Sequence, residues 1–327
     1  MSSIVVIAHR GASGERPEHT LESYRVAIEQ GADYIEPDLV MTRDGVLIAR
    51  HENEISGTTD VAQHRAFAAR RRTQIIDGES FTGWFTEDFT LSEIKTLRAR
   101  ERLAELRPQN REFDGRFAVP TFDEIMQLVM SANRHPGRNR PVGVYPETKH
   151  PAHFAGIGLP QELSLLDTLR RYQYATPGSP VFIQSFDARN LQQLRRMTPL
   201  PLVQLLEHEL GDVGAIAKYA DAIGIAKALA TPAAVMAAHA ANLRVHVWTF
   251  RAENEFLPPD LRAGSSPADH GNLEAEIRRF LERGIDGFFV DFPALGVRAR
   301  DAYISAVQPV HQPAAATSLP GNKLQGR

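Results

Sequence analysis

The feature that most constrains the fold of this chain is a series of short apolar runs rich in β-branched residues, separated by amphipathic stretches. Each run suits one buried strand, and the stretches between runs have helical spacing, as in LESYRVAIEQG (21–31), which ends at a glycine. The runs are IVVIA (4–8), DYIEPDL (33–39), VGVYPE (142–147), VFIQSF (181–186), LVQLL (202–206), AIGIA (222–226), RVHVWTF (244–250) and DGFFVDF (286–292).

Eight strands that alternate with helices predict an α/β fold, a TIM (β/α)8 barrel. An open doubly wound sheet shows the same alternation, but it usually has fewer strands and often a Gly-rich phosphate loop, and this chain has no G-x-G-x-x-G motif. The length of 327 residues and the hydrophobic content of 43% suit one elaborated barrel. We therefore expect a single domain over residues 1–307 and a disordered tail over 308–327, which is polar and aperiodic.

One interval, 52–119, interrupts the alternation, because it contains no clear buried strand. Thr90 with Glu93 inside this interval, and Thr121 with Glu124 just after it, have the spacing of a capping box, so a helix is expected to begin at each threonine. The interval therefore predicts an inserted, mainly helical lobe after the second strand region. We expect this lobe to lie over one mouth of the barrel, a position that suits a lid restricting substrate size.

Composition excludes several classes of function. Lys and Arg number 37 against 40 Asp and Glu, a balance that gives no electrostatic reason to bind nucleic acid or an acidic membrane. The chain has no cysteine, so disulfides, thiolate metal sites and cysteine nucleophiles are excluded. The N-terminus, MSSIVVIAHR, lacks a basic leader and its apolar run is too short for a membrane span, which predicts a cytoplasmic protein as written.

Three carboxylates fall at the ends of two different runs. Alternation along a strand places Glu36 and Asp38 on one face, and the intervening Pro37 predicts the end of regular pairing there. In GVYPETK the same alternation puts Glu147 and Lys149 together. Three such carboxylates can hold one hard divalent cation, Ca²⁺ or Mg²⁺, and without it their mutual repulsion would raise a pKa. The alternative is that Glu36 and Asp38 simply cap nearby groups.

Two histidines join this set, since His9 ends the first run and His51 ends the segment that follows the Asp44-Gly45 turn. Imidazoles titrate near neutral pH, so the pair suits acid and base catalysis. Arg10 and Lys149 add positive charge suited to a phosphoryl group, and Gly11 and Gly14 would let backbone approach it. In a parallel barrel the carboxyl ends of the strands form the active mouth, where all of these residues are expected.

At these residues the chain resembles the glycerophosphodiester phosphodiesterase family, in particular its long bacterial, mostly periplasmic branch. The resemblance runs in family order from residue 4 to about 300. It rests on HRGASGERPEHTLESY, GADYIEPDLVMTRDGVLIARHENEI, PTFDEI, VYPETKHP, QSFD, VHVWTF and GIDGFFVDFP. A periplasmic location would require that a leader had been removed from the start of the chain.

The resemblance implies a role for each matching residue. Glu36, Asp38 and Glu147 would bind one Ca²⁺ or Mg²⁺, and His9 and His51 would form the acid-base pair. Arg10 and Lys149 would hold the phosphate, with Glu18 behind them, while Trp248 and Phe186 would wall the glycerol pocket. The sequence departs from the family at Glu52, where aspartate is usual, and at His19, where most members have asparagine.

The resemblance implies metal-dependent hydrolysis of a small-molecule glycerophosphodiester to glycerol 3-phosphate and an alcohol. The alternatives are a phospholipase D-like cleavage of lysolipids, a barrel that binds phosphodiesters without turning them over, and an isomerase or aldolase that uses Lys149 as a Schiff base. The sequence leaves open which histidine is the acid, whether water or a substrate hydroxyl attacks, the preferred alcohol, and the oligomeric state.

Overall fold

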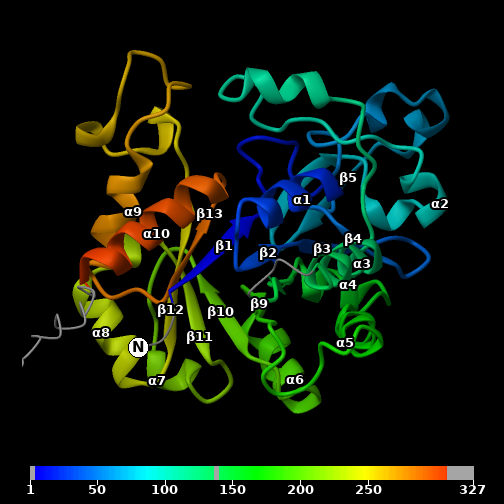
Figure 1. The fold of residues 1–327 in the computed structure, drawn as a ribbon. Helices are drawn as coiled ribbons and strands as arrows, with labels where there is room; N and C mark the ends of the chain where they lie inside the picture. The colour runs from blue at the N-terminus through cyan, green and yellow to red at the C-terminus, as the bar shows by residue number, and fades with distance from the viewer. Residues whose placement is uncertain (1–3, 136–139, 308–327) are drawn as a thin grey trace, which may run out of the picture.

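The protein folds as a closed barrel of eight parallel strand positions surrounded by helices (Figure 1), as seen in a computed structural model that describes residues 4–135 and 140–307. Two of the positions are each split in two at a proline. The barrel strands are β1 (Val5–His9), β2 (Tyr34–Glu36) with β3 (Asp38–Met41), β7 (Gly143–Val144) with β8 (Glu147–Thr148), β9 (Ile183–Ser185), β10 (Leu202–Leu206), β11 (Ala222–Ala226), β12 (Arg244–Phe250) and β13 (Gly287–Val290). The tail expected at 308–327 lies outside the described residues.

Pairing runs continuously around the barrel, so every one of the eight predicted runs contributes a strand. β1 pairs with β13 on one side and with β2 on the other, and β3 continues to β8, which pairs with β9. The break at Pro37 is real but partial. Pairing with β1 ends at Glu36, whereas the Pro37 carbonyl still accepts from the Glu147 N–H at 2.9 Å.

Helices follow the strands and cover the outside of the barrel. Both predicted capping boxes are present, at Thr90 and Thr121. The helices that cover the barrel are α1 (Leu21–Glu29), α3 (Phe122–Asn133), α4 (Pro151–Gly156), α5 (Glu162–Arg171), α6 (Ala188–Met197), α7 (Val213–Ile216), α8 (Pro232–Ala240), α9 (Leu273–Leu281) and α10 (Pro293–Val307). No helix in the described ranges is both long and apolar enough to cross a bilayer.

The interval 52–119 forms a lobe over the barrel mouth, shown mainly in cyan in Figure 1. It follows β4 (Leu47–Ala49), which pairs antiparallel with β3 through the Asp44-Gly45 turn. Its helices are short: the α-helix α2 (Leu91–Ile94) and the 3₁₀ helices η1 (Val61–Gln63), η2 (Arg65–Arg70), η3 (Thr86–Asp88) and η4 (Pro108–Phe113). The lobe also holds an antiparallel pair that the sequence did not predict, β5 (Arg72–Ile76) with β6 (Glu79–Gly83).

The barrel interior is filled by side chains and is not an open channel. A buried layer of Ile7, Tyr145, Phe182, Val203, Ala222 and Phe289 closes it below the mouth. Within this layer the Tyr145 hydroxyl lies 2.7 Å from Nδ1 of His246, so the buried imidazole has a polar partner. The layer forms a dry floor under the polar residues that gather above it.

Candidate active site

A cavity of about 100 Å³ opens at the carboxyl ends of the barrel strands. Eight of the ten sequence-predicted site residues line it, namely His9, Arg10, Glu36, Asp38, His51, Glu147, Phe186 and Trp248, together with Gln184, Leu205, Thr249, Arg251 and Phe289. Lys149 lines an adjoining cavity of about 570 Å³, and Glu18 stands behind Arg10. The structure therefore brings all ten residues to one mouth.

The three predicted acidic ligands converge within this cavity. Strand register sets Asp38 directly beside Glu147, and one oxygen from each of the three carboxylates lies within 4.8 Å of the others. Glu36 accepts the Arg10 backbone N–H at 2.7 Å and the Gln184 amide at 3.0 Å. These two neutral donors hold the Glu36 carboxylate in place without neutralising it.

The charges of this cluster fit a bound cation. Burial raises the pKa of Glu147 to about 8, because the nearby Lys149 only partly offsets the loss of solvation, and Asp38 raises it further. Burial next to Asp38 also raises the pKa of Glu36 well above its usual range. Oδ1 of Asp38 is buried and has no hydrogen-bond partner. An oxygen-ligated divalent cation would relieve the repulsion and give that oxygen a partner.

His9, at the end of β1, is held by a carboxylate. Its Nδ1 lies 2.6 Å from Oδ1 of Asp291, which directly follows β13. Burial alone would raise the pKa of Asp291, but Arg107 and Arg251 hold it well below its usual range. Asp291 therefore accepts the bond, and His9 carries its proton on Nδ1, leaving Nε2 free. Burial, with Arg10 nearby, lowers the pKa of His9 to about 4.

His51, like His9, is oriented by a carboxylate at its Nδ1. Its Nδ1 lies 2.7 Å from Oε1 of Glu52, and its Nε2 lies 3.3 Å from Nζ of Lys149. Glu52, which stands where the family usually has aspartate, thus holds the His51 ring through Nδ1. The second oxygen of Glu52 is held by His150 at 2.8 Å. Burial lowers the pKa of His51 to about 3, with Arg10 and Lys149 adding to the effect.

The cationic residues are fixed by ion pairs rather than left mobile. Arg10 pairs with Glu18 at 2.9 Å, and Nε of Arg10 lies 3.5 Å from Asp38. Lys149 lies 3.2 Å from Glu147. Arg10 adopts a left-handed backbone conformation with φ 59°, followed by Gly11 at φ 85°, and this turn directs the Arg10 N–H at Glu36. Arg10 and Lys149 therefore present fixed positive charge beside the carboxylates.

The two glycines of the same loop have a packing role that the sequence did not show. A Cβ at Gly11 would lie 2.4 Å from Oγ of Ser23, and one at Gly14 would lie 2.4 Å from the Phe292 ring. Both positions thus require glycine irrespective of any ligand. Phe186 and Trp248 both line the cavity and pack edge to face at 5.9 Å between ring centroids, and their contact with glycerol stays a prediction.

Sequence reasoning missed several residues that support the site. His19 is fully buried, with Nε2 3.0 Å from Asp38 and Nδ1 2.8 Å from the Tyr24 hydroxyl. Asp291 could have been predicted from the sequence, because it is a carboxylate at the polar end of the eighth apolar run, where site residues are expected. Arg107 could not have been predicted, because its contact with Asp291 joins residues 184 positions apart.

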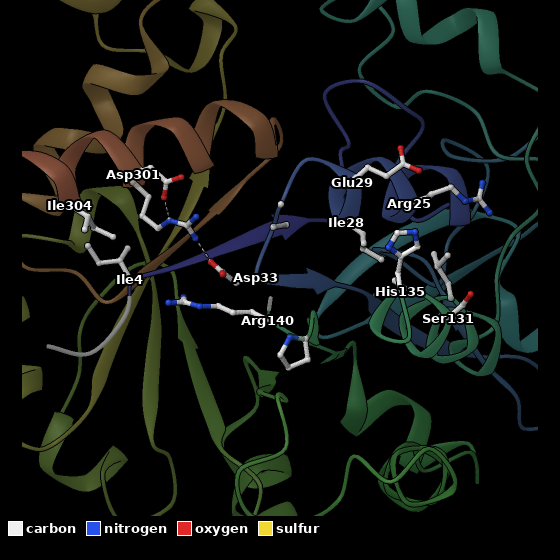
Figure 2. Close-up of a pocket in the computed structure, with 16 residues that line it drawn as sticks. Ile4, Arg25, Ile28, Glu29, Asp33, Ser131, His135, Arg140, Asp301 and Ile304 are labelled. Atoms are coloured by element: carbon white, nitrogen blue, oxygen red, sulfur yellow. Dashed lines mark hydrogen bonds and ion pairs between the residues drawn. The ribbon is translucent and has the colours of Figure 1, made fainter. Parts of the chain in front are cut away.

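A larger cavity, of about 910 Å³, lies at the opposite end of the barrel between α1, α3 and α10 (Figure 2). Ile4, Ile28 and Ile304 give it apolar walls, and Arg300 on its rim is paired with Asp33 and Asp301 at 2.6 and 2.8 Å. Among the described residues, the only group of three candidate metal ligands is Glu36, Asp38 and Glu147. The chemistry therefore points to the smaller cavity.

A parallel barrel with carboxylates and imidazoles at its carboxyl-end mouth defines an enzyme of the (β/α)8-barrel class. Residues 9–295 match the model of the glycerophosphoryl diester phosphodiesterase family, and this chain belongs to that family. A glycerophosphodiester phosphodiesterase of Arabidopsis thaliana is 36% identical over 327 residues, covering 88% of this chain and 83% of that protein. One of Bacillus subtilis (strain 168) is 31% identical and covers 92% and 87%, respectively.

The fold comparison agrees. The structure of an Oleispira antarctica phosphodiesterase in complex with the product sn-glycerol-3-phosphate superimposes with a TM-score of 0.66 at 19% sequence identity. The match covers 91% of this chain and 96% of that one. At this identity the likeness establishes the shared barrel, and the chemistry must be argued from the residues at its mouth.

Proposed function

We propose that the protein hydrolyses glycerophosphodiesters, such as glycerophosphocholine or glycerophosphoethanolamine, to glycerol 3-phosphate and an alcohol, with one bound Ca²⁺ or Mg²⁺. The observation that carries this proposal is the convergence of three carboxylates, two oriented imidazoles and two fixed cations at one mouth of the barrel, around two adjoining cavities. The names of the Arabidopsis and Bacillus relatives support the substrate class.

Glu36, Asp38 and Glu147 would hold the cation, which when bound would neutralise charge on the phosphate as the reaction proceeds. Arg10 and Lys149 would bind the anionic oxygens of the diester and stabilise the charge that develops on them. Both are already held by carboxylates, so little reorganisation is needed when the substrate enters.

His9 and His51 would carry the proton transfers. One imidazole takes a proton from the attacking water or glycerol hydroxyl, and the other gives a proton to the leaving alkoxide as the P–O bond breaks. In the free protein burial keeps both rings neutral, with pKa values of about 4 and 3. The negative charge of a bound phosphodiester would raise the pKa of an adjacent imidazole and favour the protonated form that the donor needs.

The adjoining cavity bears on the leaving alcohol. It shares His51, Glu147, Phe186 and Trp248 with the first cavity, and its outer lining includes the carboxylates Glu52, Asp77, Asp187 and Glu207. Four carboxylates in this lining suit a hydrophilic alcohol better than an acyl chain, which requires apolar walls. This observation supports glycerophosphodiesters over lysolipids.

The test is a screen of glycerophosphodiesters for release of glycerol 3-phosphate after EDTA treatment and readdition of Ca²⁺ or Mg²⁺. We expect metal-dependent turnover that His9→Ala and Glu147→Ala each abolish. The matched controls are His239→Ala and Glu274→Ala, which remove surface ion pairs with Asp286 and Arg298. Release of choline from lysophosphatidylcholine, with glycerophosphocholine untouched, would overturn the assignment. So would binding of diesters without any turnover.

A further inference from the structure

The inserted lobe sends one buried arginine across to the barrel mouth. Arg107 precedes η4 and is 2% exposed. Its Nη1 donates to the Ser13 carbonyl at 2.9 Å, while Nε and Nη2 donate to the carboxylates of Glu253 and Asp291, respectively. All three partners belong to the barrel loops. A buried guanidinium that is bonded through all three of its nitrogens in this way is fixed in position.

Asp291 connects this guanidinium to His9. One carboxylate oxygen, Oδ1, lies 2.6 Å from Nδ1 of His9, and the other, Oδ2, receives Arg107 and the Nε of Arg251 at 3.1 Å. Arg107 and Arg251 therefore fix the rotation of the Asp291 carboxylate, and that carboxylate fixes the orientation of the His9 imidazole. A histidine held through Nδ1 in this way presents Nε2 in a fixed direction.

The lobe also holds the backbone next to His9. Arg107 and Asn110 both donate to the Ser13 carbonyl, and the Ser13 hydroxyl donates to the His9 carbonyl at 2.8 Å. Glu253 is fully buried and keeps Arg107 in place from the opposite side. His9 is thus held at its ring and at its backbone by the same part of the lobe.

We propose that Arg107 is a positioning residue for the reaction: the inserted lobe completes the site by fixing Asp291, which in turn fixes the His9 imidazole. The inference rests on the proposed function for its kinetic consequences, but the orientation of His9 can be measured without turnover. It gives the lobe a role in catalysis beside any role in covering the mouth.

The experiment compares Arg107→Met, Arg107→Lys and Arg107→Met/Glu253→Gln with the wild type. The double variant removes the unpaired buried carboxylate that the single variant would leave, so a folded protein remains available. Arg70→Met is the matched control, because it removes an Arg–Glu93 pair confined to the lobe. We expect a fall in kcat of about 10- to 100-fold for both Arg107→Met proteins, with KM changed by less than about threefold.

Two further measurements distinguish a positioning role of Arg107 from a general loss of structure in its variants. Added guanidinium chloride at non-denaturing concentration should restore part of the kcat of Arg107→Met, and Arg107→Lys should retain an intermediate value. The ¹⁵N resonances of His9 should show the Nδ1–H tautomer in the wild type and a mixture of tautomers in the Arg107→Met proteins. Wild-type kcat and an unchanged tautomer in these proteins would overturn the proposal, as would an equal loss in Arg70→Met. A wild type that fails to turn over would reject the proposed function while leaving the tautomer test valid.

Discussion

Binding of Ca²⁺ or Mg²⁺ is expected to release a proton and therefore to strengthen steeply with pH. The reason is Glu147, whose pKa burial raises to about 8, so that it must lose a proton before it can act as a ligand. A carboxyl with a pKa of about 8 is about 1% ionised at pH 6 and half ionised at pH 8. The dissociation constant of the cation should then fall about 50-fold between pH 6 and pH 8. This corresponds to a gain of about 2 kcal/mol in the free energy of binding.

Glu36 adds to this effect, because its pKa is also raised by burial beside Asp38. The 50-fold change is thus a lower bound. Isothermal titration calorimetry in buffers of different ionisation enthalpy would give both the dissociation constant and the number of protons released. We expect about one proton or more at pH 6.5, and Glu147→Gln should bind weakly with a flatter pH dependence. Equal affinity at pH 6 and 8, with no proton released, would refute the electrostatic reasoning.

Three further results are expected. His9→Gln and His51→Gln should each lower kcat by about 10²- to 10⁴-fold while shifting Tm little, as measured by steady-state kinetics and thermal unfolding; activity near wild type in either would remove that residue from the acid-base pair. The free energy of unfolding should fall as pH drops from about 6.5 to 4, because burial lowers the pKa of His246 to about 4. As pH falls, the unfolded chain takes up the proton before the folded protein does, so His246 contributes at most about 3 kcal/mol to stability above pH 6.5. His246→Gln should therefore flatten the dependence of the unfolding free energy on pH, measured by urea titration. An unchanged slope in this variant would argue against the contribution of His246. Gly14→Ala should destabilise the protein by about 1–3 kcal/mol through contact with Phe292, whereas Gly156→Ala, which meets no atom within 4 Å, should not; equal urea midpoints would contradict the packing argument.

The strands and the candidate ligands were predictable from the sequence because their signals are local. Buried β-branched runs mark the barrel strands, and Glu36, Asp38 and Glu147 stand at the ends of two such runs, where the barrel brings strand ends together. His9 follows the same rule. The prolines at 37 and 146 split strands without ending them, since the Pro37 carbonyl can still accept a bond.

What the sequence could not show depends on contacts between distant residues. Pairing of Arg107 with Asp291 has no local pattern, and neither does the burial of Gly14 against Phe292. The exposed β5–β6 pair was missed because its polar residues lack the apolar alternation of a buried strand. The expectation that the lobe acts as a lid stays a prediction. Deletion of the lobe, residues 52–119, would also remove Glu52 and Arg107. We therefore expect this deletion to abolish activity and not only to widen the range of substrates accepted.

The most direct test of the account is a crystal structure of the protein with Ca²⁺ and glycerol 3-phosphate. We expect one ion bound by oxygens of Glu36, Asp38 and Glu147 at about 2.3–2.6 Å, with Oδ1 of Asp38 among them. The phosphate should lie on that ion, between Arg10 and Lys149 and within reach of both imidazoles. Saturated crystals with no ion shared by the three carboxylates, or with the phosphate bound elsewhere, would contradict the account.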